Sequence, residues 1–443
     1  MKKGIRILSL AAALVLSLVM FTGCASSAEG DSDAPSTKRI SMTVGIPVDE
    51  NDAEWADWQS VLSSWVEDFS TYYNINLKFT KVPTEEKALK KFMKKVDSGK
   101  VACFFSSRED FINELIEKKS ILSVSTIRES YSAIMEKTSD AVYSISQEDS
   151  LTNYMIPIYG TYQGLFYNRT LLKELNLPNP TSWENLLADI EGLKAAGYTP
   201  IAAGFKDEGL NYMVEEIIMS EGGTAEHSYT PSFGVISSWE RAVTDLKSLE
   251  NAGAFTADCY QVSFQEAVDA FLDGSAAMIV APSTAFNGAL PADDVKVVGF
   301  PNAPSGKREN SAFIGRLTHG VYVSSDFFSK PDERYSEAIA EILGSSYFGS
   351  ADFYELFADE STICADVSYY ESFGSTQMDN ALKSLLTNAE AADWTMSERA
   401  YTFDVTVNSF RKALTGSDVT AALQEATDAE IAASEAAQAE QKD

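Results

Sequence analysis

The sequence is poor in the residues that build metal sites and disulfide scaffolds. It has four cysteines and two histidines among 443 residues. Cys103, Cys259 and Cys364 lie too far apart for a CxxC pair, and neither histidine lies close enough to a cysteine to form a zinc motif. An odd number of thiols beyond Cys24 allows at most one disulfide within the chain. We therefore expect no metal and no cofactor.

Positive charge is also scarce. Lys and Arg total 35 against 65 Asp and Glu, which gives a formal net charge of −30. Nucleic acid is bound through basic residues that displace counterions, and anionic membranes attract basic patches, so this balance argues against both partners. With 45% hydrophobic residues the chain can still bury large cores. Its length predicts two or three folded units.

Enzyme signatures are absent as well. The sequence has no GxSxG, no HExxH and no GxGxxG after a strand. The nearest mimic of a phosphate loop, Gly299–Lys307, has six residues between its glycines where the motif requires four. This lack of a reaction signature favours binding over catalysis, and we expect the protein not to be an enzyme.

The N-terminus has the pattern of a secretory signal. Lys2, Lys3 and Arg6 precede an apolar run over residues 7–21. This run is shorter than the ~20 residues that a membrane-spanning helix needs. We therefore expect residues 1–23 to be a signal peptide.

The signal ends in a cysteine. Phe21-Thr22-Gly23-Cys24 resembles the bacterial lipobox, in which the cysteine is diacylated and becomes the new N-terminus, although phenylalanine replaces the usual leucine. Ordinary signal cleavage beside an incidental Cys24 is the alternative. The resemblance implies a lipid anchor on the extracytoplasmic face of the cell membrane, and residues 24–39, polar and without apolar periodicity, would form a flexible tether. We expect contact with the membrane through this anchor only.

The rest of the chain alternates strand and helix patterns. Residues 40–46 predict a strand, and Trp55, Trp58 and Trp65 follow at helical spacing. An aromatic stripe of this kind favours a helix core over a ligand platform.

Two capping boxes support the same alternation. Thr181 with Glu184, and Ser263 with Glu266, predict the starts of two helices that each end near a glycine and lead into a strand. Repeated strand and helix units predict an α/β fold with parallel sheet covered by helices. From about Tyr335 the pattern is mostly helical.

A series of short motifs in the middle of the chain resembles a known family. The motifs follow one another in order at Tyr154–Ile158, Leu165–Asn168, Thr181–Glu184, Thr199–Ile201 and Phe271–Met278. Together they resemble the extracellular solute-binding proteins of bacterial carbohydrate ABC transporters, family 1, maltose-binding-protein-like. The resemblance spans about residues 40–430. It implies a two-lobed fold, in which each lobe is a mostly parallel sheet flanked by helices, with a ligand cleft between the lobes.

The family's lobes are discontinuous in sequence. Carried over, lobe 1 would comprise residues 40–156 plus 319–370, and lobe 2 residues 157–318 plus 371–443. The segments that cross between lobes would be Pro157-Ile158, Phe313–Gly320 and a stretch near Cys364–Tyr370.

The resemblance also implies a function. The protein would capture a carbohydrate, either a mono- or an oligosaccharide, and deliver it as a monomer to the permease subunits of an ABC transporter. A surface sensor or adhesin that uses the same clamp without transport is the alternative, and a secreted glycosidase is a third possibility.

Sugars present apolar C–H faces and a ring of hydroxyls, so their sites need flat aromatics together with polar acceptors and donors. Ligands of open α/β sheets bind in the loops at strand ends. Residues of suitable chemistry at expected strand ends or beside the first crossing are Asp49, Glu50, Ser106, Ser107, Arg108, Glu109, Tyr159, Thr161 and Tyr162. The alternatives are solvated surface for the charged residues and a buried strand position for Tyr162.

The family resemblance adds three further candidates. Tyr212 and Phe403 align with aromatics that face the ligand in relatives, although Phe403 equally fits a helix core. Ser283 stands where relatives often place a sugar-stacking tryptophan, so that platform is missing here.

Overall fold

The computed structural model describes residues 38–107, 110–132, 154–223, 234–304, 306, 312–359, 361–388, 390–393 and 403–440. Contacts separate the segment Met1–Arg39 from a body that comprises Ile40–Asp443. The predicted signal peptide, Cys24 and nearly all of the predicted tether lie outside the described residues. No helix within the described ranges combines the length and the apolar character that crossing a membrane requires.

A mixed sheet runs through the body. Its described strands are β1 (Ile40–Ile46), β2 (Ile75–Lys81), β3 (Cys103–Ser107), β4 (Ile156–Asn168), β5 (Thr199–Ala202), β6 (Ala276–Pro282), β7 (Val295–Val298), β8 (Ala312–Val323), β9 (Ile363–Cys364) and β10 (Glu390–Asp393). The order is β2-β1-β3-β8-β4-β6-β5, while β7 and β9 pair with β4, and β10 pairs with β8. Pairing is parallel between β1 and its neighbours β2 and β3 and between β5 and β6, as the repeated strand and helix units predict, whereas β8 pairs antiparallel with β3 and β4, and β4 pairs antiparallel with β6 and β7.

Helices surround both ends of this sheet. Around β1–β3 and the end of β8 lie α1 (Trp55–Tyr72), α2 (Glu86–Asp97), α3 (Asp110–Glu117), α4 (Val124–Ser130), α12 (Ser325–Phe328), α13 (Arg334–Ile342) and α14 (Ala351–Tyr354). The remaining helices are α6 (Arg169–Glu174), α7 (Trp183–Ala196), α8 (Gly209–Gly222), α10 (Ser237–Ala252), α11 (Phe264–Leu272), α15 (Val367–Ser372), α16 (Gln377–Asn388), α18 (Phe403–Leu414) and α19 (Val419–Glu440), with the 3-10 turn η3 (Ser283–Phe286). The C-terminal part is mostly helical, as expected.

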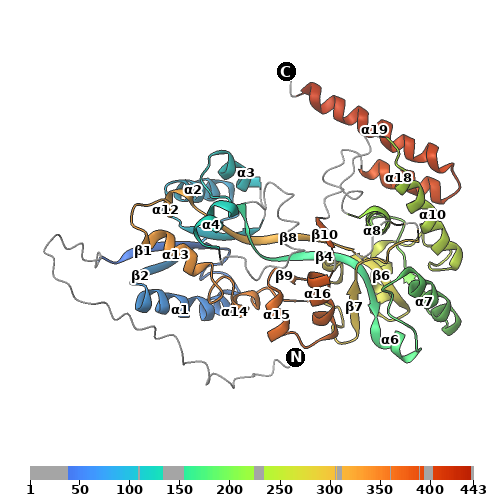
Figure 1. Ribbon diagram of the computed structural model, residues 1–443, viewed down its shortest axis with the longest axis horizontal. Coiled ribbons are helices and arrows are strands. Elements are labelled where there is room, and N and C mark those ends of the chain that lie inside the picture. Colours follow the sequence, from blue (N-terminus) through green and yellow to red (C-terminus); the bar gives the residue numbers. More distant parts are fainter. Residues whose placement is uncertain are drawn as a thin grey trace, which may run out of the picture. The chain divides into compact units, whose positions relative to one another are not determined.

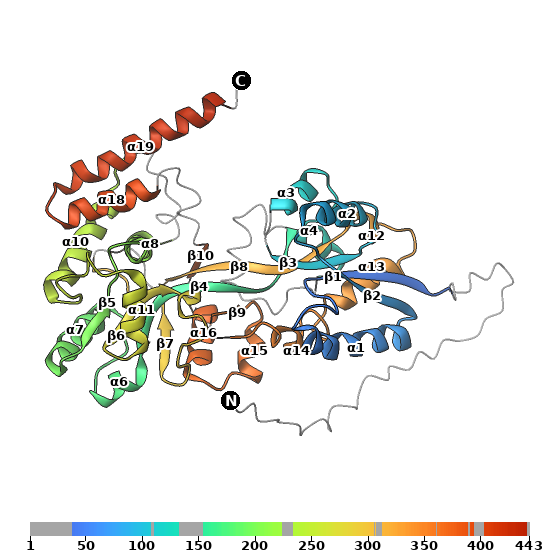
Figure 2. The same ribbon diagram turned by 180° about the vertical axis from the view of Figure 1, so that it is seen from behind.

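Two long strands connect the ends of the sheet. β8 pairs with β3 through His319–Val323, and antiparallel with β4 along most of its length. β4 then pairs with β6 and β7 through its C-terminal half. Figures 1 and 2 show β4 and β8 side by side between the helices around β1–β3 and those around β5–β7. The first two predicted crossings fall on these strands, and the third begins at β9, which pairs with β4 at Tyr159.

The aromatic stripe of α1 belongs to the core, which confirms the core interpretation. Trp58 and Trp65 are 4% and 3% exposed. Trp58 packs edge-on against Phe353 with 5.6 Å between ring centroids, and Trp65 packs the same way against Phe348 at 5.2 Å. Trp55 is half-buried at the edge of the same cluster.

One predicted capping box is confirmed and the other is wrong by one residue. Ser263 accepts from the Glu266 backbone N–H, while the Glu266 carboxylate accepts from the Ser263 N–H at 2.8 Å. The cap of α7 is Ser182 rather than Thr181, because the Ser182 hydroxyl accepts from the Asn185 N–H at 3.2 Å. That helix ends at Gly197, whose φ of 89° places it in the left-handed region that favours glycine.

The core around β5 and β6 encloses an acid. Asp189 lies on the buried side of α7 with Leu186, Ile190 and Leu193. Its side chain is 0% exposed. Neither of its carboxylate oxygens has a hydrogen-bond donor within reach among the described residues. Burial raises the pKa of Asp189 to about 7, because the ionised form loses its hydration.

Cys103, Cys259 and Cys364 are all free and buried. Burial raises the pKa of the Cys259 thiol to about 11, so this side chain stays a neutral thiol near neutral pH. The scaffold is therefore held by its apolar cores, as the cysteine count predicts.

Candidate functional site

The loop after β1 presents the first two candidate acids. Asp49 is half-buried and Glu50 is exposed. The Asp52 carboxylate accepts from the Asp49 backbone N–H at 2.6 Å and forms an ion pair with Lys81 at 2.6 Å. The Lys81 ammonium lowers the pKa of Asp52. A fixed turn thus holds Asp49 and Glu50 at the carboxyl end of β1, where open α/β sheets bind ligands.

The end of β3 carries the two candidate serines. Ser106 is buried and lies opposite Gly320 of β8, whereas Ser107 is half-buried and lies opposite His319. Arg108 and Glu109 lie outside the described residues.

Tyr159 belongs to an aromatic cluster that joins three strands. Its ring stacks on His319 at 4.5 Å and 10°, and on Phe357 at 4.7 Å and 27°. Phe105 of β3 lies 5.9 Å from the His319 ring and 5.0 Å from the Phe357 ring. Burial raises the pKa of Tyr159, so its hydroxyl remains protonated. His319 and Phe357 could not be identified from the sequence, because the pairing of β4 with β8 brings His319 beside Tyr159, and Phe357 reaches it from the turn after α14 by packing against Trp58, Phe105 and Phe353.

Three candidates lie around the middle of β4. Thr161 is half-buried. Tyr162 is fully buried in a hydrophobic core, which agrees with the interpretation as a buried strand position. Ser283 is 1% exposed; its hydroxyl accepts from the Tyr162 N–H at 3.2 Å and donates to the Ser361 carbonyl at 2.6 Å. In this structure the side chains of Tyr162 and Ser283 are therefore buried and expose almost no surface.

Tyr212 lies where strands β5 and β6 end. It is half-buried on the first turn of α8, with its ring 5.0 Å from that of Phe264. Asp207 fixes the start of α11 by accepting from the Phe264 N–H at 2.7 Å. Burial, and then the carboxylate of Glu208, raises the pKa of the Tyr212 hydroxyl, which therefore stays a donor at neutral pH.

A buried polar pair that the sequence analysis missed supports Tyr212. The Gln163 amide of β4 donates to the Tyr212 carbonyl at 3.4 Å and to the Glu216 carboxylate at 3.3 Å. Gln163 is fully buried, although nothing in the sequence shows that α8 packs over it.

Phe403 is the first residue of α18, and its side chain lies outside what the structure describes. Arg411 of the same helix donates to the Phe205 carbonyl just after β5. This contact holds α18 beside the end of β5, from which the chain leads to α8 and Tyr212.

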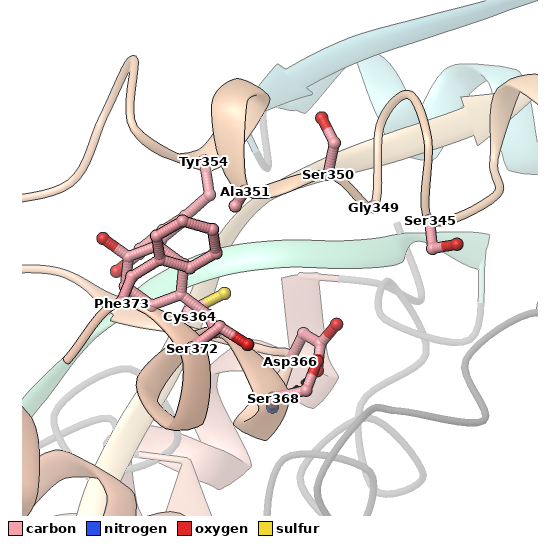
Figure 3. A pocket seen from close by; sticks show the side chains of 11 residues that line it. Ser345, Gly349, Ser350, Ala351, Tyr354, Cys364, Asp366, Ser368, Ser372 and Phe373 are labelled. Carbon is pink, nitrogen blue, oxygen red and sulfur yellow. Dashed lines mark hydrogen bonds between the residues drawn. The ribbon is translucent and has the colours of Figure 1, made fainter. Parts of the chain in front are cut away.

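A separate cavity of about 230 Å³ lies beside α14, β9 and α15 (Figure 3). Its lining combines serine hydroxyls and an acid with aromatic rings: Ser345, Ser350, Tyr354, Asp366, Ser368, Tyr369, Ser372 and Phe373, together with Gly349, Ala351 and Cys364. A second cavity of about 180 Å³ shares Tyr354 and Tyr369. None of the candidates from the sequence lines either cavity. Among the residues that the structure describes, no group of three or more His, Cys, Asp or Glu side chains could hold a metal ion.

A family model described as bacterial extracellular solute-binding protein matches residues 52–326, which is more than half of the chain. The chain belongs to this family. As a bacterial extracellular solute-binding protein, it has the fold and family of proteins that bind substrates rather than transform them. The family resemblance inferred from the sequence motifs is thereby confirmed.

One curated relative of this solute-binding protein is the multiple sugar-binding protein of Streptococcus mutans serotype c. The two are 34% identical over 73 residues, a match that covers 16% of this chain and 17% of the relative. The match therefore spans less than a fifth of the relative's own length.

Solved structures of solute-binding proteins share the fold. RafE from Streptococcus pneumoniae has a TM-score of 0.61 at 14% identity, covering 91% of this chain and 99% of RafE. A probable secreted solute-binding lipoprotein from Streptomyces coelicolor has a TM-score of 0.62 at 16% identity, covering 88% and 98%. The solute receptor AcbH has a TM-score of 0.61 at 13% identity, covering 88% and 97%. These similarities confirm the two-lobed α/β fold class.

Proposed function

We propose that this solute-binding protein captures a carbohydrate between its two lobes and delivers it to the permease subunits of an ABC transporter. The chemistry named for its relatives supports a sugar ligand. The matched protein of Streptococcus mutans is a multiple sugar-binding protein, AcbH is described as preferring β-D-galactopyranose, and RafE is known in complex with raffinose.

The observation that carries the proposal is Tyr212 at the carboxyl ends of β5 and β6. A half-buried aromatic ring beside a fixed carboxylate, Asp207, supplies the stacking face and the acceptor that a pyranose needs. On the other side of the proposed cleft, Asp49 and Ser107 add polar groups at the ends of β1 and β3.

The proposed lobes comprise residues 40–156 plus 319–370, and residues 157–318 plus 371–443. Strands β4, β8 and β9 then contain the hinge, because β4 pairs with both β8 and β9 where the chain passes between the proposed lobes. Binding would close the lobes around the sugar.

The proposal includes the anchor. After removal of residues 1–23, an acylated Cys24 would hold the protein, as a monomer, on the extracytoplasmic face of the membrane, and residues 24–39 would let the body reorient. The likeness to a probable secreted lipoprotein agrees with this form of the protein.

A thermal-shift screen against mono- and oligosaccharides tests the proposal. A ligand present at about a hundred times its dissociation constant should stabilise the folded protein by about 2.7 kcal/mol. Each sugar that shifts the melting temperature is then incubated with the protein and analysed for turnover. A complete absence of shifts across the library would contradict sugar binding, and released products would identify a glycosidase. Loss of sugar uptake on deletion of the gene would separate transport from sensing.

A further inference from the structure

The acidic chain carries one concentrated block of positive charge. Residues 86–100 contain six lysines, Lys87, Lys90, Lys91, Lys94, Lys95 and Lys100, and only two acids, Glu86 and Asp97, in a chain whose net charge is −30. We call these six residues the lysine face. All six are exposed, because Phe92, Met93 and Val96 bury the opposite side of α2 in the core.

Among the described residues, one neighbouring acid forms an ion pair with the lysine face. Lys90 forms an ion pair with Glu86 at 2.6 Å, and Glu114 of the adjacent α3 pairs with Lys118. Figures 1 and 2 show α2 and α3 next to each other, and Glu114 lies close enough to Lys90 to contribute to the raised pKa of that ammonium. The other charged residues in the same two helices and the loops beside them are Glu85, Arg108, Glu109, Asp110, Glu117 and Lys119. Within the described ranges Lys87, Lys91, Lys94, Lys95 and Lys100 have no ion-pair partner.

Helix stability does not account for this cluster. Lys94 and Lys95 in the last turn complement the helix dipole. Lys87 lies in the first turn, where the dipole disfavours a positive charge, and Lys87 with Lys91 and Lys91 with Lys95 form like-charge pairs at i, i+4 spacing, which repel. The arrangement opposes the formation of α2, so a role outside folding is the better explanation.

The composition of the lysine face points to a diffuse anionic surface. Protein interfaces are depleted in lysine and depend on arginine or aromatic anchors, yet residues 86–100 contain no Arg, Trp or Tyr, and their one phenylalanine, Phe92, is buried. Anionic lipid headgroups need no shaped pocket for binding. Each lysine near an anionic membrane surface increases the partition coefficient of a protein onto that membrane by about fivefold.

We propose that the lysine face rests on anionic lipid headgroups and orients the tethered body on the membrane. This inference rests on the proposed lipid anchor, which keeps the body within a tether's reach of roughly 20 Å. The large negative net charge does not prevent it, because charges farther than about 8 Å from the headgroups are screened at physiological salt. The membrane contact would then extend beyond the lipid anchor that the sequence analysis expected to be the only one.

Vesicle binding tests this directly. The mature chain with Cys24→Ser, which cannot be acylated, is sedimented with vesicles of equal parts phosphatidylglycerol and phosphatidylcholine, and with vesicles of phosphatidylcholine alone. We expect binding only to the anionic vesicles, lost at about 1 M salt, where the Debye length falls to ~3 Å. Changing Lys87, Lys91, Lys94 and Lys95 to glutamine should weaken binding at least tenfold.

The matched control changes Lys173, Lys206, Lys247 and Lys296 to glutamine, which removes the same charge elsewhere and should leave vesicle binding unchanged. Both variants should keep their melting temperature and the wild-type response to whichever sugar the screen identifies, so a failure of this inference is distinct from a failure of sugar binding. Equal loss of binding in the two variants, or no binding to anionic vesicles at all, would overturn the proposal.

Discussion

Replacing Asp189 by asparagine tests whether the core around β5 and β6 contains an uncompensated acid. Asparagine keeps the size and polarity of a protonated carboxyl but cannot ionise. The pKa of Asp189 is raised from the ordinary 3.8 to about 7 by burial, a gap of about three units. At 1.36 kcal/mol per unit, ionisation of this group costs the folded state at most about 4 kcal/mol.

The raised pKa determines how this cost depends on pH. Well below 3.8 the carboxyl is protonated in both states, so there is no penalty. As pH rises from 3.8 to about 7, the unfolded chain ionises first and the free energy of unfolding falls; above about 7 the penalty is complete. Asp189→Asn should therefore be more stable than the wild type by a few kcal/mol at about pH 8, and by clearly less at about pH 5.

Urea unfolding followed by tryptophan fluorescence at the two pH values measures the difference. Glu191→Gln is the matched control, because Glu191 is an exposed acid on the same helix and its replacement should leave the pH dependence unchanged. If Asp189→Asn destabilised the protein equally at both pH values, Asp189 would be accepting hydrogen bonds in the folded state and the reasoning would be refuted.

Three further predictions concern the proposed function. Tyr212→Ala should weaken sugar binding at least several-fold, by about 1 kcal/mol or more, and Tyr212→Phe should retain affinity if the ring makes the contact; titration calorimetry checks this, and normal binding with a much lower melting temperature would make Tyr212 a core residue. Cys24→Ser should release the folded protein from membranes washed with about 1 M salt, which also removes the proposed contact of the lysine face, and continued detergent-dependent partitioning of this variant would contradict the anchor. Saturating sugar should reduce the radius of gyration measured by solution scattering, whereas an unchanged value would indicate a rigid platform.

Local sequence patterns predicted the structure correctly where only one residue suited the position. Ser263 and Glu266 form the predicted capping box, and the spacing of Trp58 and Trp65 places both rings in the core. At Thr181-Ser182 two adjacent hydroxyls compete for the cap. Each is followed three residues later by a backbone N–H that it could bond, and the sequence cannot choose between them.

Parts of the candidate site depend on contacts between segments far apart in the chain, and these the sequence did not reveal. Tyr159 meets His319 because β4 pairs with β8, and it meets Phe357 because the turn after α14 packs against Phe105 and Phe353. Tyr162 and Thr161 are neighbours of similar chemistry, yet alternation along β4 buries the first in the core and leaves the second half-buried. Residue type identified plausible sugar contacts, but the register of the sheet determines which of them are accessible.

The pairing of β4 with β8 has a consequence for how the chain reaches its native state. Ile156 lies beside Val321, and Cys103 of β3 lies beside Val323. β3 can pair earlier with β1, and β4 with β6 and β7, but each keeps one edge unpaired until the chain has been made as far as β8. Pairings this distant in sequence form slowly, and strands that wait for them expose unpaired edges that can aggregate. A fragment that ends before Ala312 should therefore have no stable native form, and folding should be completed only after most of the chain has emerged.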